Sequence, residues 1–565
     1  MTLLNKIQSD KKSQFWLFFI VLVLLTLFMM VCNGPTLTYS GYDFYFHYRR
    51  LHTLIEALQE GTYPFYIDYS NVDGYGYFTK GFYSDVILIP FAVIGIFTST
   101  YFAYDVMLFT MTILCGVFMY HTVNVIYKNR YAASVSAILY TFAVYRLYDI
   151  YQRGALAEGL SFTFLPIVFL GIYHIIKSDY RKWYILAIGY SLLIYTHAIA
   201  SVLMFVTLLI LLIVYYKAIF KEPKRLLYLC VAGAITLIIV SSYVIPTIEQ
   251  LASNSFYLDS RRPGGGAGYG KVGFDLILWG FVSGIAYPDM LWTGAGIILM
   301  SIILLRFFVK KNEKGESLKS IDIGVLIGLF FIVATSRIFP WGRFPFSILG
   351  FIQYPWRLYE FVSFFFAVAG GYYLSVIFIK SRARFIAGSI LIALTMLTVY
   401  IHSENFKFLY NNKALQIYDG SSNEIPSFEN RYHAIGGEYF PSRLPAIEYI
   451  RDRGEIVESL NNGSKIENLK REQNITTFSV EVNKKDSLVL PLLYYYGYTA
   501  TLNGRTIPVT QSEFGLAQIP VDESGKVEAY YKGTTLQWIS IYLSLAGILA
   551  LCIYIIAIRK RKNDE

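Results

Sequence analysis

The sequence predicts a mainly α-helical, polytopic membrane protein with a β-rich external domain before its last membrane helix. The chain has 565 residues, of which 55% are hydrophobic and only 16% charged. A soluble globule of this size would need more polar surface. Apolar runs long enough to cross a bilayer recur along the chain, and clusters of Lys and Arg lie between them.

The basic residues indicate membrane topology and do not indicate nucleic-acid binding, although the formal net charge is +10. They fall in short segments between or after apolar runs, as expected for cytoplasmic loops: 128–130, 177–182, 217–225, 310–319, 380–384 and 559–562. The first apolar run, 15–31, follows Lys6, Lys11 and Lys12, and no small-residue cleavage pattern follows it, so we interpret it as a retained helix. The four cysteines suggest neither a disulfide framework nor a metal site.

Applying this rule along the chain gives about twelve to thirteen membrane helices, with both termini in the cytoplasm. The expected spans are 15–33, 105–126, 131–147, 159–177, 182–196, 198–216, 226–246, 289–309, 321–338, 358–379, 385–402 and 536–558. The apolar segment 86–98 would place Lys128 and Arg130 outside if it crossed. We therefore expect it to be embedded in the membrane without crossing.

The spans divide the chain into three parts. Residues 1–402 form a membrane module with a long first external loop at 34–104, residues 403–535 form an external β-rich domain, and residues 536–565 form the last helix and a basic cytoplasmic tail. "TTFSVEV", "TIPVTQ" and "KVEAYYKG" alternate or cluster β-branched and aromatic residues. Asn503-Gly504 predicts a hairpin turn between two strands, and a small β-sandwich is the expected fold of this domain.

Asp43 is the first candidate functional residue, in the stretch "SGYDFYFHYRRL" that follows the first apolar run. Residues 43–59 show the spacing of an amphipathic helix on the outer leaflet. In one interpretation Asp43 only caps this helix, and the basic side chains extend toward lipid headgroups. In the other, Asp43 is an ionised carboxylate aimed at the membrane surface, with His47 and Arg50 on the same face.

Further polar residues recur in the other external turns. Each has a structural explanation, such as a salt bridge at a helix end or an interfacial aromatic. Together they would surround one external cavity in a helical bundle: Asp149, Arg153, Glu158, His197, Arg261, Arg262, Gln353, Trp356 and Arg357. Carboxylates mixed with arginines suit a phosphate-bearing lipid and a hydroxyl nucleophile. The cytoplasmic loops are too short for a nucleotide-binding domain, and no Walker or Rossmann fingerprint occurs.

Several motifs resemble a known family along nearly the whole chain. They are "GYDFYFHYRR", "GYGYFTKGFYSD", "YQRGALAEGLSFTFLPI", "YTHAIAS", "IQYPWRL", "GGEYFP" and "LPLLYYYGYTATLNGRTIPV". This set resembles the bacterial YfhO-like membrane proteins and the membrane family labelled 6-pyruvoyl-tetrahydropterin-synthase-related, which are similar to the GT-C glycosyltransferase superfamily. The pterin label implies no pterin chemistry, since no His cluster suited to zinc is found.

The resemblance implies a GT-C enzyme in which an acidic residue of the first external loop is the general base and a second acid comes from a later loop. By motif position these are Asp43 and Glu158. Asp43 is the single acidic residue at this position, whereas many GT-C enzymes have a pair of acidic residues there. This difference favours a mechanism without a metal, although binding of a divalent cation stays an open alternative.

The implied reaction transfers a sugar, with inversion, from an undecaprenyl-phosphate-linked donor to a cell-envelope acceptor such as a teichoic acid, another polysaccharide or a lipid. It would take place on the outer face of a bacterial plasma membrane. Arg153 and Arg357 would neutralise the leaving phosphate, with Arg261, Arg262 and His197 as secondary candidates.

Two other functions stay open from the sequence. A transporter or flippase for an envelope lipid would usually have ionisable residues near mid-membrane. The ionisable residues of the expected spans lie toward the ends instead: His121, Arg146, His174, Arg306 and Glu360. A non-catalytic scaffold that displays the β-rich domain would not need the external carboxylates.

Overall fold

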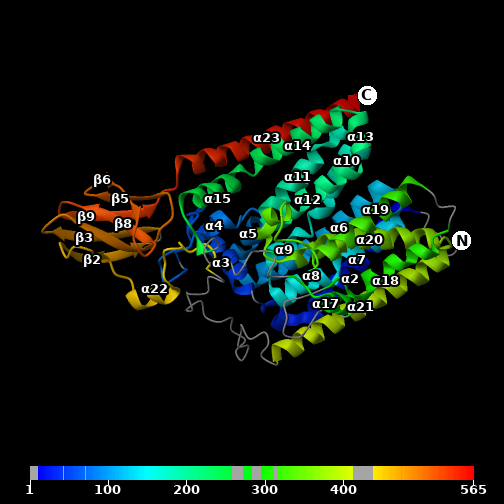
Figure 1. The fold of residues 1–565 in the computed structure, drawn as a ribbon, viewed down its shortest axis with the longest axis horizontal. Helices are drawn as coiled ribbons and strands as arrows, with labels where there is room; N and C mark the ends of the chain where they lie inside the picture. Colours follow the sequence, from blue (N-terminus) through cyan, green and yellow to red (C-terminus); the bar gives the residue numbers. More distant parts are fainter. Residues whose placement is uncertain are drawn as a thin grey trace. The chain divides into compact units, whose positions relative to one another are not determined.

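The computed structural model describes residues 10–41, 43–69, 71–257, 267, 271–282, 294–310, 315–411, 437–472 and 474–564. It is mainly helical, with a β-rich region near the C-terminus (Figure 1). The chain forms two compact units. The first comprises Met1–His47, Tyr101–Thr236 and Pro263–Asn423, and the second comprises Tyr48–Thr100, Leu237–Arg262 and Glu424–Glu565.

The first unit is a helical assembly. Its elements are α2 (Lys11–Thr38), α6 (Thr100–Tyr127), α7 (Arg130–Thr141), α8 (Val144–Leu147), η1 (Tyr148–Arg153), α9 (Leu156–Ser161), α10 (Leu165–Lys177), η2 (Tyr180–Lys182), α11 (Tyr184–Thr196), α12 (Ala198–Val214), α13 (Tyr216–Lys221), most of α14 (Lys224–Ile239), α17 (Phe274–Val282), α18 (Gly296–Ile302), η4 (Ile303–Phe308), α19 (Glu316–Ala334), η5 (Phe346–Ile352), η6 (Pro355–Leu358), α20 (Tyr359–Ile377) and α21 (Ser381–Asn411).

Helix α20 forms the centre of this unit. Its sequence "YEFVSFFFAVAGGYYLSVI" is apolar on all sides, which is typical of a helix surrounded by others. It packs against α7 and α19. Of the most apolar 18-residue stretch within Pro355–Ile377, 83% of the residues are buried. By contrast, α2 and α21 contact each other, but only 28% and 22% of the residues in their most apolar 18-residue stretches are buried.

Within the described residues, six helices are long and apolar enough to cross a membrane: α2, α6, α19, η6 with α20, α21 and α23 (Thr535–Asp564). The pair α14 and α15 (Ser241–Ser253) adds a seventh if it counts as one bent span. Several of the expected spans are shorter or interrupted. The expected span 131–147 breaks after Thr141 because α7 ends there, and 159–177 is divided between α9 and α10, which has Pro166 in its first turn.

The second unit combines short helices with a β-sandwich. Its helices are most of α3 (Phe44–Glu60), α4 (Thr79–Phe82), α5 (Ile89–Phe97), α15, α22 (Ile447–Arg453) and α23. The segment expected to be embedded without crossing corresponds to α5, which is only 9 residues long. Helix α15 packs against α23, where Ser241 donates a hydrogen bond to the carbonyl of Ser540 at 2.8 Å.

In the described part of the second unit, nine strands form two antiparallel sheets. They are β1 (Glu458–Ser459), β2 (Ser464–Glu472), β3 (Ile475–Val482), β4 (Asp486–Leu493), β5 (Tyr498–Leu502), β6 (Arg505–Ile507), β7 (Thr510–Gln511), β8 (Leu516–Val521) and β9 (Gly525–Tyr531). One sheet has the order β1-β4-β8-β7 and the other β2-β3-β9-β5-β6. The expected hairpin is confirmed: Leu502 pairs with Arg505, and Asn503 and Gly504 both have positive φ.

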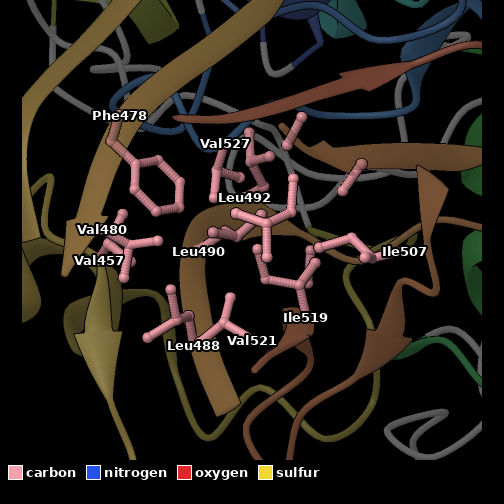
Figure 2. Packing of buried hydrophobic residues seen from close by; sticks show 14 residues of the cluster. Val457, Phe478, Val480, Leu488, Leu490, Leu492, Ile507, Ile519, Val521 and Val527 are labelled. Atoms are coloured by element: carbon pink, nitrogen blue, oxygen red, sulfur yellow. The ribbon is translucent and has the colours of Figure 1, made fainter. Parts of the chain in front are cut away.

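The two sheets share one hydrophobic core, as Figure 2 shows. Strand β3 alternates buried and exposed positions, so that Phe478 and Val480 point inward. They meet Leu488 and Leu490 of the other sheet in the same buried cluster. The β-rich region is therefore a sandwich in which each of the two sheets contributes one face to the core.

Candidate functional site

The candidate site lies in the first unit, where two backbone segments distant in sequence come into direct contact. The Asp43 N–H donates a hydrogen bond to the carbonyl of Arg153 at 2.8 Å. Gly41 and Gly154 permit this approach, since both have positive φ (107° and 66°). A Cβ on Gly41 would lie 2.6 Å from the nitrogen of Gly154. The glycines of two separate motifs thus place Asp43 beside Arg153.

Arg153 ends the π-helical turn η1, in which Asp149 lies four residues earlier. Arg153 Nη1 lies 2.8 Å from Asp149 Oδ1 and 2.9 Å from Glu158 Oε2. Gly154 ends the turn in the left-handed conformation. The turn therefore brings both carboxylates onto one guanidinium, and π-helical turns of this kind are frequent at functional sites.

Glu158 joins this pair to a segment about two hundred residues later in the chain. Its Oε2 also lies 3.3 Å from Arg357 Nε, and its Oε1 accepts a hydrogen bond from the hydroxyl of Tyr145. Burial opposes ionisation of this carboxyl, but Arg153 and Arg357 outweigh it and lower the pKa of Glu158 to about 2. Glu158 is therefore a permanent anion that holds two arginines. We call Asp43, Asp149, Arg153, Glu158 and Arg357 the charged cluster.

Asp149 differs from Glu158 although both contact the same arginine. Burial and the neighbouring charge of Glu158 raise the pKa of Asp149 well above its usual value, against the effect of Arg153. Its Oδ2 atom is buried and accepts no hydrogen bond from any group in the described part of the chain. Two carboxylates on one guanidinium compete for a single positive charge, so the second of them binds its proton more tightly.

Asp43 is the partly exposed carboxylate of the charged cluster. Helix α3 begins at the next residue, and the His47 N–H donates to the Asp43 backbone carbonyl at 3.2 Å. Among the described residues, nothing donates a hydrogen bond to its carboxylate, so the helix-cap interpretation has no such bond to support it. Burial raises the pKa of Asp43, although Arg153 and Arg357 counteract this shift. A carboxylate with a raised pKa and free lone pairs is suited to accept a proton.

Arg357 is held by the segment that precedes α20. Its Nη1 donates to the carbonyl of Ile352 and its Nη2 to Gln353 Oε1, both at 3.3 Å. The guanidinium lies over the ring of Tyr354, 5.6 Å from its centroid, and Tyr354 stacks on Trp356 at 4.2 Å. Gln353 and Trp356, both predicted from the sequence, thus position Arg357.

His197 lies between α11 and α12 and caps the second of them. Its Nδ1 accepts a hydrogen bond from the N–H of Ala200 at 3.4 Å, which leaves the proton of a neutral ring on Nε2. Burial lowers the pKa of His197 to about 3; the charge of Glu158 opposes this shift, while Arg357 and Arg153 add to it. His197 is therefore a neutral donor close to the charged cluster.

The remaining predicted residues have other environments. His47 is buried in the first turn of α3. Arg50 belongs to the second unit, where it lies 3.6 Å from Asp85 and donates to the carbonyl of Ser84 at 2.8 Å, so it is buried and paired rather than extended toward headgroups. Arg261 and Arg262 lie outside the described residues.

The surroundings of Glu158 include three residues that the sequence did not assign to the site, Tyr145, Ser161 and Glu360. Tyr145 donates to its carboxylate, and Ser161 lies 2.6 Å from its backbone carbonyl and 2.5 Å from Glu360 Oε1. Tyr145 lies four residues before Asp149, and only this helical spacing could have indicated it. In the described part of the chain, no three His, Cys, Asp or Glu side chains come together in a way that could hold a metal ion.

No family model matches this chain. It is similar to a protein of Lactococcus lactis subsp. cremoris (strain MG1363) whose printed description is "Uncharacterized protein". The two are 22% identical over 605 aligned positions, which cover 97% of this chain and 96% of the relative. The similarity therefore covers nearly the whole length of both chains.

Proposed function

We propose that this chain is a polytopic bacterial membrane protein that transfers a sugar from a polyprenyl-phosphate-linked donor to a cell-envelope acceptor. The six long apolar helices support the membrane location. The basic segments between apolar runs support cytoplasmic termini and an extracytoplasmic site. The proposed activity rests on the environment of the Asp43 carboxylate. No residue in the described part of the chain donates a hydrogen bond to it, and it lies beside two arginines that Glu158 holds.

In the proposed reaction, an acceptor hydroxyl attacks the anomeric carbon of the donor sugar. The bond to the lipid phosphate breaks, and the phosphate leaves with the electron pair, so the configuration at the anomeric carbon inverts. Asp43 takes the proton of the attacking hydroxyl. A base with a raised pKa accepts this proton more readily than an ordinary carboxylate does.

The leaving phosphate gains negative charge in the transition state and needs preorganised donors. Arg153 uses Nη1 for both of its ion pairs, which leaves Nε and Nη2 without a partner among the described residues. These two N–H groups form the edge that binds a phosphate bidentately. Glu158 keeps both guanidinium groups in place, and Arg357 supplies the second positive charge.

Asp43→Asn tests the proposal. The amide has a similar shape and still offers an oxygen to a helix N-terminus, but it does not accept the proton. Loss of a positioned base costs roughly a hundred- to ten-thousand-fold in rate, whereas loss of a cap costs only about 0.5 to 2 kcal/mol of stability. Mass spectrometry of envelope glycans would compare deletion cells that express the wild type or the variant. Full restoration of a missing sugar by Asp43→Asn would refute the assignment.

Arg146 favours a second candidate function, the transport of an anionic envelope lipid. This side chain is fully buried in α8 and donates to the carbonyl of Thr141 and to Thr112 Oγ1, both at 3.0 Å. No carboxylate pairs with it among the described residues, and lone buried cations often mark transport paths. Transport predicts that Arg146→Gln abolishes lipid translocation in proteoliposomes, whereas sugar transfer predicts that translocation never occurs.

A further inference from the structure

The second unit contains a large cleft to which the proposed chemical step assigns no role. Its volume is about 1090 Å³. The walls come from one face of α3, the segment that follows α3, the β2–β3 connection, the end of β9 and the start of α23. Pockets for drug-sized ligands measure roughly 300–1,000 Å³. The cleft therefore has room for an oligomer rather than for a single small molecule.

Aromatic side chains form part of the lining. Trp538, in the first turn of α23, is 47% exposed although it is large and apolar, and its indole N–H lies 3.4 Å from the carbonyl of Lys532. Tyr66 makes an edge contact with Tyr531 at 6.3 Å. Rings fixed in this way present flat apolar faces. The C–H face of a sugar ring stacks on such a surface, while its hydroxyls stay free for polar groups.

The charged groups of the lining largely cancel. Arg49 lies 3.4 Å from Asp68, and Arg471 lies 3.9 Å from Glu455. Glu56 lies 3.2 Å from His52, which also belongs to the lining. With His52 neutral, the lining has three basic and four acidic side chains and thus a formal charge of −1. A polymer of phosphates would meet net repulsion here, because recognition of phosphate needs an excess of Arg or Lys.

Planar amides complete the set of groups that recognise hydroxyls. Asn474 is fixed by the β9 backbone, since its Oδ1 accepts from the Tyr531 N–H at 3.2 Å. Gln537 donates to Glu249 at 3.0 Å. Carboxylates, amides and guanidinium groups together provide both donors and acceptors, which a hydroxyl needs. Charged and amide groups on the walls also make the cleft unsuitable for an acyl chain.

We infer that this cleft binds a neutral glycan chain of several sugars, which is the acceptor of the proposed transfer. The inference rests on the proposed function and narrows its acceptor, since it excludes a polyanionic polymer such as a teichoic acid. This one cleft combines aromatic faces that can stack on sugar rings, paired charged groups that can bind sugar hydroxyls, and a volume sufficient for several sugar units.

The test measures binding to the full-length protein in detergent by isothermal titration calorimetry. The probes are three neutral hexasaccharides, maltohexaose, cellohexaose and chitohexaose, and the comparison ligand is poly(glycerol phosphate). At least one hexasaccharide should bind saturably and more tightly than the polyanion. Trp538→Ala should weaken that binding at least tenfold. Tyr542→Ala provides the matched control, because Tyr542 is on the same helix, 68% exposed and outside the cleft lining.

Three outcomes would overturn the inference: binding of none of the hexasaccharides, tighter binding of the polyanion, or equal losses for Trp538→Ala and Tyr542→Ala. The proposed function is separable from it, since Asp43→Asn should retain hexasaccharide binding while it loses transfer. If the wild type bound a hexasaccharide but transferred no sugar, the proposed transferase activity would be refuted and glycan binding by the cleft would stand. If Trp538→Ala transferred sugar with an unchanged acceptor KM, glycan binding by the cleft would be refuted and the transferase activity would stand.

Discussion

Replacement of Gly41 by alanine should disable the site without touching any charged side chain. The added Cβ would lie 2.6 Å from the nitrogen of Gly154 and 2.8 Å from the carbonyl carbon of Arg153, whereas ordinary contacts begin near 3.4 Å. The two segments must therefore separate by about 0.8 Å, the difference between 3.4 and 2.6 Å. The Asp43 N–H bond to Arg153, now 2.8 Å, would lengthen to about 3.6 Å and be lost.

This displacement moves the proposed base away from the proposed phosphate donors. A misplacement of about 1 Å costs on the order of a hundredfold in rate, so we expect Gly41→Ala to lose roughly ten- to a hundredfold of its transfer activity. The alanine also has to adopt positive φ, which costs of the order of 1–3 kcal/mol. Sugar transfer by isolated membranes and thermal unfolding in detergent would measure the two effects separately.

Gly61→Ala separates backbone strain from displacement. Gly61 also has positive φ, at 70°, but a Cβ there would meet nothing within 4 Å. This variant should lose stability and keep its activity per folded molecule. If Gly41→Ala transferred sugar within twofold of Gly61→Ala after correction for folded protein, the contact between the two glycine segments would have no role in positioning Asp43.

Four further predictions concern the charged cluster and the topology. Arg357→Lys should reduce transfer at least tenfold, because an ammonium group does not replace a planar fork; wild-type kinetics would leave Arg357 as an interfacial anchor. Glu158→Gln should lower the free energy of unfolding by about 3–5 kcal/mol, since the buried Arg357 loses its carboxylate while Arg153 keeps Asp149, and a melting curve like that of the wild type would contradict this. Transfer should fall with decreasing pH through a pKa above the usual aspartate value, because Asp43 acts only when deprotonated and its pKa is raised; a profile flat from pH 4 to 8 would contradict this. In a variant without native cysteines, Asn503→Cys should react with an impermeant thiol reagent in intact cells and Ser317→Cys should not. Equal labelling of the two would refute the sides of the membrane assigned to these segments.

Local sequence signals were sufficient for much of the fold. The Asn503-Gly504 turn formed as expected because only residues that tolerate positive φ fit a two-residue hairpin. The longest apolar runs became long helices. The interruptions in other runs were not predicted, since the break after Thr141 and the π-helical turn at Tyr148–Arg153 depend on packing within the bundle rather than on Pro or Gly signals.

Local spacing accounts for one contact of the candidate site. Asp149 and Arg153 pair at helical spacing, which a sequence shows directly. The pairing of Glu158 with Arg357 joins residues about two hundred positions apart. The expected topology placed both residues in external turns around one cavity, but no local spacing indicated that they pair. Arg50 was grouped with Asp43 because a helix face was assumed, whereas its ionic partner is Asp85.

The environments of Asp43 and Glu158 assign them different roles. The resemblance implies Asp43 as the general base and Glu158 as a second acid without a fixed role. Glu158 has a pKa of about 2, and its two oxygens are engaged by Arg153, Arg357 and Tyr145. It is therefore a weak base. Asp43 has a raised pKa and no described donor on its carboxylate. Two carboxylates whose surroundings separate their pKa values in this way divide the work between proton transfer and charge stabilisation. Glu158 should accordingly be unable to replace Asp43. The activity that remains in Glu158→Gln should therefore still fall toward low pH, because Asp43 is still the base, whereas Asp43→Asn should remove this pH dependence. A residual activity of Asp43→Asn that falls toward low pH as in the wild type would contradict this division of roles.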